Sequence, residues 1–349
     1  LWLARRLGVS GERIVLNGPG RSPRALRTAI ELGALIQLNQ REELPLLAEL
    51  ARGAGKRCRV GVRVVPGHGW AGQFGEPIAG GSALGCYREL AARPEFELCA
   101  LHTHLGGEIA DAAQVRELVR ELLDFYGVLR GQLGLSLPIV DFGGSLACAT
   151  TTHHSTRALR LNRSLGIELR PRPLERVLSI ADYVRELVQG VAERCQREGW
   201  ARPRIFVEPG RALTSNTQLL LCTVTSLKQS GAAGVVHAIL DAGVNIAEPV
   251  RGEYYQIFVA GRQAADERSY RMVGPICTPM DTLAWSWRLP ELQPGSVLGI
   301  MDAGAYFVPF ATSFSFPQPA IVLVDGGEVR LVRRAEGFED LVRRDDEVG

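Results

Sequence analysis

Five short segments of this chain place charged, aromatic or sulfur-bearing side chains beside glycine. They are LHTHLGG (101–107), VDFGGS (140–145), VEPGR (207–211), GPICTPMD (274–281) and DAGAY (302–306). Each of the first three ends an apolar run that predicts a buried strand. Because active sites of β/α barrels lie at the carboxyl ends of their parallel strands, three such ends predict one shared pocket. Its composition suits an organic phosphate better than a metal ion or a nucleic acid.

Glu208-Pro209-Gly210-Arg211 directly follows the apolar run RIFV. A carboxylate held against a heterocycle favours the protonated form of a ring nitrogen, because a charged hydrogen bond stabilises that form. Arg211, on the same turn, suits a carboxylate or a phosphate. An ion pair that caps a turn at the rim of a barrel is the structural alternative, and these four residues alone do not choose between the two.

A Gly-Gly-Ser turn, Gly143-Gly144-Ser145, follows the run LPIVDF. Successive glycines let backbone N–H groups approach an anion closely, and Ser145 adds a hydroxyl group. Tight turns use the same pair of glycines for purely structural reasons, so this signal is weak by itself.

His102 and His104 lie two residues apart on one predicted strand, so both rings should lie on the same face. A metal site would need a third ligand, which Asp141 or Glu208 could supply. Alternatively His104, nearer the strand end, could stack on a flat aromatic ligand. A histidine with only a structural role in the interior is the third interpretation and the more frequent case, so these residues alone do not decide.

Cys277 lies in a rigid Gly- and Pro-containing turn, 274–281. A thiol fixed by such a turn can act as a proton donor. The alternative is a small structural cysteine, which is the more frequent case.

Apolar runs alternate with helical periodicity up to about residue 214, which predicts βαβ units and a parallel sheet. The predicted strands are 12–18, 34–40, 58–66, 96–104, 137–144 and 205–210, and the predicted helices are 22–32, 41–53, 112–134 and 180–199. A closed barrel needs eight strands, and the chain opens in a helical pattern. An open doubly wound sheet is therefore one interpretation. The other, favoured by chemistry at consecutive strand ends, is a TIM-type (β/α)8 barrel whose first units are missing here.

Short strands dominate after residue 214, at 219–229, 235–244, 255–262, 269–275, 296–306, 320–327 and 328–335. We therefore expect residues 1–214 to form the incomplete barrel and residues 215–349 to form a C-terminal all-β domain. The segment 146–179 is predicted to form a long loop.

Composition excludes several classes of partner. A net charge of +2 over 349 residues argues against capture of nucleic acid or membrane by charge. The seven cysteines have no paired spacing, which predicts reduced thiols in the cytoplasm and no structural metal site. Any mechanism that needs a lysine must use Lys56 or Lys228, since the chain has no other.

The five segments, in this order, resemble the fold type III (alanine racemase-like) decarboxylases that use pyridoxal 5′-phosphate, the diaminopimelate and ornithine decarboxylase group. The match runs from about residue 12 to residue 344. The resemblance implies that His104 stacks on the cofactor ring and that Glu208 pairs with the pyridine nitrogen. It also implies a phosphate site lined by Gly107, Gly144, Ser145, Gly210, Arg211 and Tyr306, and it adds Pro209 to the residues that bind the cofactor.

For catalysis, the resemblance implies that Cys277 serves the site of the opposite subunit in a homodimer. There it would protonate the carbon from which carbon dioxide has left. Contacts to the amino acid substrate are expected from Arg211, Thr278, Asp281 and Tyr306.

Two departures from the family pattern matter. The Schiff-base lysine of the family lies on the first barrel strand, and no such strand or motif is present. We therefore expect that an N-terminal portion is missing and that this chain alone is inactive. Thr278 stands where diamine-forming members carry an acid, and Glu253-Tyr254 replaces a Tyr-Asp pair. These changes favour a modified or carrier-linked amino acid as the substrate, as in siderophore or antibiotic assembly.

Three other functions are compatible with parts of this pattern. A racemase would share the fold, but Cys277 favours decarboxylation. A non-catalytic homologue that acts as a regulatory partner would explain the missing lysine. A metal-dependent hydrolase using His102 and His104 is the least supported.

Overall fold

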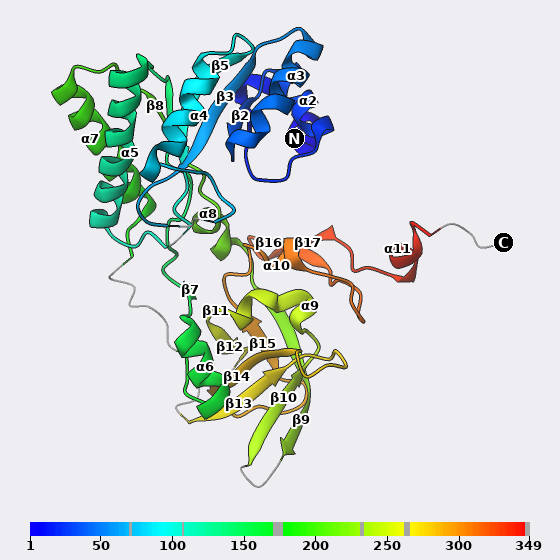
Figure 1. Ribbon diagram of the computed structural model, residues 1–349. Coiled ribbons are helices and arrows are strands. Elements are labelled where there is room, and N and C mark those ends of the chain that lie inside the picture. The colour runs from blue at the N-terminus through cyan, green and yellow to red at the C-terminus, as the bar shows by residue number, and fades with distance from the viewer. Residues whose placement is uncertain (70–71, 107, 170–176, 231–233, 262–265, 346–349) are drawn as a thin grey trace. The chain divides into compact units, whose positions relative to one another are not determined.

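The computed structural model (Figure 1) describes residues 1–69, 72–106, 108–169, 177–230, 234–261 and 266–345. The described chain forms two compact units. Unit 1 comprises residues 1–147 and 177–210, and unit 2 comprises residues 148–169 and 211–345. The boundary expected near residue 214 thus lies at 210/211, and a segment expected in the barrel belongs to unit 2.

Unit 1 alternates strands with helices. Its elements are α1 (Trp2–Arg6), β1 (Val15–Leu16), α2 (Pro23–Leu32), β2 (Leu35–Leu38), α3 (Leu44–Ala54), β3 (Cys58–Val65), β4 (Glu76–Pro77), α4 (Ser82–Ala91), β5 (Phe96–Thr103), α5 (Ala112–Leu133), β6 (Ile139–Asp141), α7 (Ile180–Glu198) and β8 (Arg204–Phe206).

The main sheet of unit 1 follows the order β1-β2-β3-β5-β6-β8, with β4 paired to β3, and all neighbours are parallel. A doubly wound sheet reverses its strand order at a switch point, whereas the strands of a barrel follow chain order. No reversal occurs among the described strands of this sheet. The predicted TIM-type barrel architecture is therefore confirmed.

Local sequence signals fix the helix ends in unit 1. Ser22 caps the start of α2 by accepting from Ala25 N, and Gly33 ends it in the left-handed conformation. Asp111 and Gln114 form a capping box at the start of α5. These caps fix the ends of the helices, and Gly33 ends α2 two residues before β2 begins at Leu35.

Unit 2 is rich in strands. Its elements are β7 (Thr152–His153), α6 (Thr156–Leu165), α8 (Arg211–Thr214), β9 (Leu220–Ser230), β10 (Val235–Leu240), α9 (Val244–Ala247), β11 (Glu253–Tyr254), β12 (Ile257–Val259), β13 (Glu267–Val273), β14 (Thr282–Pro290), β15 (Val297–Ile300), α10 (Phe307–Phe310), β16 (Ile321–Asp325), β17 (Glu328–Arg333) and α11 (Phe338–Val342).

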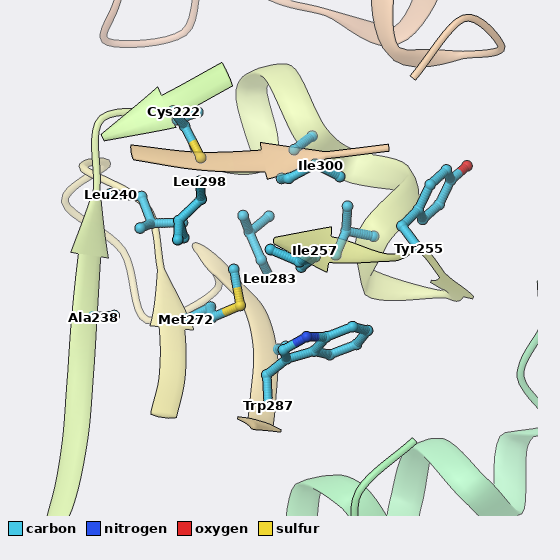
Figure 2. Packing of buried hydrophobic residues seen from close by; sticks show 14 of the residues in the cluster. Cys222, Ala238, Leu240, Tyr255, Ile257, Met272, Leu283, Trp287, Leu298 and Ile300 are labelled. Carbon is cyan, nitrogen blue, oxygen red and sulfur yellow. The ribbon is translucent and has the colours of Figure 1, made fainter. Parts of the chain in front are cut away.

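A six-stranded sheet, ordered β12-β15-β9-β10-β13-β14, organises unit 2, and the predicted β domain is confirmed. All its described pairs are antiparallel except β10 with β13. Figure 2 shows the buried cluster, in which Met272, Leu283 and Trp287 pack together. This core holds the turn between β13 and β14, which carries Cys277.

Several elements of unit 2 were not predicted, and the longest of them are strand β14 and helix α6. Strand β14 was overlooked, although most of its residues are buried. Helix α6 lies within the segment expected to be a loop. Its ends carry clear signals, because Ser155 accepts from Ala158 N at the start and Gly166 is left-handed at the end.

Within the described residues, no helix is long and apolar enough to span a lipid bilayer.

Candidate active site

Polar side chains gather at the carboxyl edge of the sheet in unit 1. Asn17 follows β1, His104 follows β5, the Gly143–Ser145 turn follows β6 and Glu208 follows β8. Parallel strands bring these ends to one edge, as the sequence predicted. The contacts among them define one cluster in which Glu208 is central.

The Glu208 carboxylate is held from several sides. Asn17 Nδ2 donates to Oε1 at 2.9 Å, and His102 Nε2 lies 3.7 Å from the same oxygen. His104 Nδ1 lies 3.9 Å from Oε2. The backbone of Glu208 is fixed as well, because its N–H donates to Gly143 O at 2.7 Å. Since 32% of the side chain is exposed, the carboxylate is oriented from behind and can still receive a ligand.

His104 is a neutral ring locked against the glycine turn. Gly144 N–H donates to its Nδ1 at 3.1 Å, so Nδ1 is an acceptor. Ser145 Oγ lies 3.4 Å from the other ring nitrogen and accepts from Gly106 N–H at 2.8 Å. Burial, and then the charge of Arg63, lowers the pKa of His104. A neutral, partly exposed imidazole suits stacking on a flat ligand.

Only glycine fits at positions 143 and 144 of the turn after β6. Gly143 has a φ of 65°, and a Cβ there would lie 2.4 Å from Thr103 O and 2.8 Å from His104 Nδ1. A Cβ on Gly144 would lie 2.6 Å from Glu208 O. The two glycines therefore let three strand ends approach each other, which is a packing role in addition to any role toward an anion.

Two buried groups lie behind Glu208. His102 is fully buried, and burial followed by the charge of Arg63 holds its pKa well below the usual range. Asp141 is also buried and accepts from Gly143 N–H at 3.0 Å. Burial, and then the neighbouring charge of Glu208, raises the pKa of Asp141 to about 7. The interior of the cluster thus favours neutral groups.

The Asp141 carboxyl makes the stability of the protein depend on pH. Its pKa rises from an ordinary 3.8 to about 7, so the folded state retains a proton that the unfolded chain loses. The free energy of unfolding should therefore fall by on the order of 1–3 kcal/mol as pH rises from about 4 to about 7. Asp141→Asn keeps an acceptor for Gly143 N–H and should abolish most of this fall. Chemical denaturation at several pH values measures it, and an unchanged slope in the variant would contradict the assignment.

Hydrogen bonding in the cluster argues against a metal ion. His102, Asp141 and Glu208 each offer a ligand atom, and these atoms lie within 4.8 Å of one another. However, Asn17 Nδ2 donates to Glu208 and lies 3.5 Å from His102 Nε2. An amide nitrogen has no lone pair for a cation. The cluster is therefore built as a hydrogen-bond network that orients a carboxylate.

Asn17 did not enter the sequence interpretation, and Asp141 entered it only as a possible metal ligand. Each ends a predicted strand, 12–18 or 137–144, and that position was the available signal. The sequence could not predict the hydrogen bond between Asn17 and Glu208, since these residues are 191 positions apart.

Arg211 lies in unit 2 and forms a bidentate ion pair with Glu253, at 2.7 and 2.5 Å. Each side chain is 12% exposed. Tyr255 OH donates to the same carboxylate at 2.6 Å, and the Arg211 guanidinium lies 4.8 Å from the centre of the Tyr306 ring. Burial opposes the charge of Arg211, but Glu253 outweighs it and raises the pKa. The structural alternative for Arg211, an ion pair, is present, and its role at a phosphate stays a prediction.

The other predicted residues of unit 2 differ in accessibility. Cys277 is exposed, whereas the other six cysteines are buried. Thr278 follows it in the turn, and Asp281 is buried. Tyr306 is 41% exposed, has a φ of 72° and stacks on Phe310.

The remaining predicted residues belong to unit 1. Pro209 and Gly210 are exposed just after Glu208. Gly107 lies outside the described residues.

Neither lysine belongs to the strand ends that form this cluster. Lys56 precedes β3, at the amino end of that strand, and its Nζ donates to Glu31 O at 2.6 Å. Lys228 is part of β9 in unit 2. No lysine is found at the described strand ends that surround Glu208.

The chain is similar to known proteins over most of its length. A family model described as "Pyridoxal-dependent decarboxylase, pyridoxal binding domain" matches residues 1–215. A diaminopimelate decarboxylase from Methanothermobacter thermautotrophicus is 31% identical, covering 98% of this chain and 77% of the relative. One from Aquifex aeolicus is 28% identical, with the same coverage. The crystal structure of diaminopimelate decarboxylase from M. jannaschii in complex with L-lysine has a TM-score of 0.81 at 21% identity, covering 99% of this chain and 77% of that chain.

Proposed function

Because this chain belongs to the pyridoxal-dependent decarboxylase family, we propose that it removes the carboxyl group of an amino acid with pyridoxal 5′-phosphate held at Glu208. The family membership confirms the resemblance drawn from the five segments, and the cofactor of the family is pyridoxal phosphate. The observation that carries the proposal is the Glu208 carboxylate, oriented by Asn17 and open on one side.

The residues present fit this cofactor. Glu208 would accept a hydrogen bond from the pyridine nitrogen and keep that nitrogen protonated. His104, a neutral ring beside Glu208, would lie against the face of the cofactor. When bound, pyridoxal phosphate supplies the electron sink that lets the bond to the carboxyl group break. The phosphate contacts stay predictions for Gly107, Gly144, Ser145, Gly210, Arg211 and Tyr306, as does the cofactor contact of Pro209.

Unit 2 carries the residue proposed as the proton donor. Cys277 is proposed to donate a proton to the carbon that has lost carbon dioxide, because it is an accessible thiol on a fixed turn. We also propose a homodimer with shared sites, in which Cys277 serves the partner. These roles, the substrate contacts of Thr278, Tyr306 and Arg211, and the cytoplasmic location stay predictions. Asp281 was predicted as a substrate contact too, but both oxygens of this buried carboxylate accept from backbone N–H groups.

We propose that the chain as printed holds the cofactor without a covalent bond. The support is that Lys56 lies at the amino end of β3 and donates to Glu31 O. The test is incubation with pyridoxal phosphate, borohydride reduction and peptide mapping. The expected result is reversible binding with no lysine adduct. An adduct at Lys56 or Lys228 would contradict the proposal and would also remove the reason to expect an inactive chain.

The substrate is tested by release of labelled carbon dioxide from carboxyl-labelled amino acids. The names of the relatives make diaminopimelate the first compound to test. Thr278, where an acid is expected, favours a modified or carrier-linked amino acid without a free distal amine. Release from neither class, with pyridoxal phosphate bound, would favour the non-catalytic alternative.

A further inference from the structure

Asp281 is a buried carboxylate with both oxygens already engaged by the backbone. It is 1% exposed. Val244 N–H donates to Oδ1 at 2.7 Å, and Ile276 N–H donates to Oδ2 at 2.7 Å. These two amides come from different places, one from the start of α9 and one from the residue before Cys277. The side chain therefore ties the Cys277 turn to a second element of unit 2.

The backbone of Asp281 closes the same turn. Its N–H donates to Thr278 O at 3.0 Å, and its carbonyl accepts from Gly274 N–H at 3.0 Å. Thr278 N–H donates in turn to Ile276 O at 2.8 Å. Residues 274 to 281 thus form a compact loop in which Asp281 is bonded through both its main chain and its side chain.

Two glycines leave no room around this carboxylate. A Cβ on Gly243 would lie 2.3 Å from Asp281 Oδ1, and a Cβ on Gly274 would lie 2.3 Å from both Asp281 Oδ2 and the Gly243 Cα. Contacts this short cannot occur between real atoms, so both positions need glycine. An enclosed carboxylate with two backbone partners is poorly placed to bind a substrate directly.

We infer that Asp281 is a positioning residue for Cys277, holding the turn that presents its thiol, and not a contact to the substrate. This inference rests on the role proposed for Cys277 above. It explains why an acid is needed at Asp281, since only a carboxylate offers two acceptor atoms to two N–H donors. It also explains how Cys277 can be exposed and yet have a defined place.

The test measures the reaction of Cys277 with a thiol reagent, with peptide mapping of the labelled sites. Asp281→Asn has the same shape but turns an NH2 group toward a backbone N–H. It should loosen the turn and raise the labelling rate of Cys277 at least fivefold, while the other six thiols stay unreactive. Asp241→Asn is the matched control, because Asp241 Oδ1 accepts one backbone N–H, from Thr223, at 2.7 Å. It should leave the rate unchanged.

Two outcomes would overturn the inference. A rate within twofold of the parent protein would show that Asp281 does not control the turn. Simultaneous labelling of all seven thiols would show a general structural role. Labelling needs neither cofactor nor turnover, so its failure is distinct from failure of decarboxylation.

If Asp281→Asn does not fold, hydrogen exchange of the parent protein decides. The Val244 and Ile276 amides should exchange at least tenfold more slowly than the Cys277 amide. Equal rates would refute the inference.

Discussion

Replacement of Glu208 by glutamine is expected to weaken binding of pyridoxal phosphate roughly tenfold to a hundredfold. The variant would lack the charged hydrogen bond between the Glu208 carboxylate and the pyridine nitrogen, and such bonds contribute about 1.5–3 kcal/mol to the free energy of binding. Glutamine has nearly the same shape, so the packing against Asn17 and His102 should survive. Equilibrium dialysis with absorbance detection of the cofactor measures the dissociation constant.

Two further variants make this prediction specific. Glu193→Gln changes an exposed carboxylate on α7 of the same unit and should leave the dissociation constant unaltered. Asn17→Ala removes the donor that orients Glu208 Oε1 and should weaken binding by a smaller factor, about threefold to tenfold, as expected for one neutral donor. Equal affinity of Glu208→Gln and the parent protein would place the ring nitrogen elsewhere.

Replacement of Arg211 by alanine is expected to destabilise unit 2 by about 3–5 kcal/mol, because it leaves the Glu253 carboxylate, which is only 12% exposed, without its cation. Tyr255 OH and His153 would still contact this carboxylate, but neither supplies a fixed charge. Chemical denaturation followed by tryptophan fluorescence reports the loss, since Trp287 lies in the core of this unit.

A double variant separates the ion pair from a role at the phosphate. Arg211→Ala combined with Glu253→Gln removes both charges and should recover much of the lost stability. Arg251→Ala breaks an exposed pair with Glu248 and should cost less than about 1 kcal/mol. If Arg211→Ala lowered cofactor affinity and left stability intact, the arginine would serve the phosphate first.

Local sequence patterns predict much of the secondary structure of this protein. The alternation of apolar runs with helical periodicity identified the strands of the parallel sheet, and caps such as Ser22 and Gly33 mark helix ends. The residues that end those strands, including His104 and Glu208, were predicted to form the site because parallel strands deliver their carboxyl ends to one edge. These features depend on neighbours in the chain, which is why the sequence alone determined them.

Only the tertiary structure decided which side chains form hydrogen bonds and ion pairs with each other. Arg211 was compatible with either a phosphate or an ion pair until Glu253, 42 residues away, was seen beside it. Asp281 was expected at the substrate, yet its oxygens accept from Val244 and Ile276 in the fold. Such pairings depend on strand register and on the space that glycines leave. Neither the register nor this space is encoded in the residues that flank Arg211 or Asp281. The sequence therefore determined which reactive side chains are present, and the fold determined the partners that they bond.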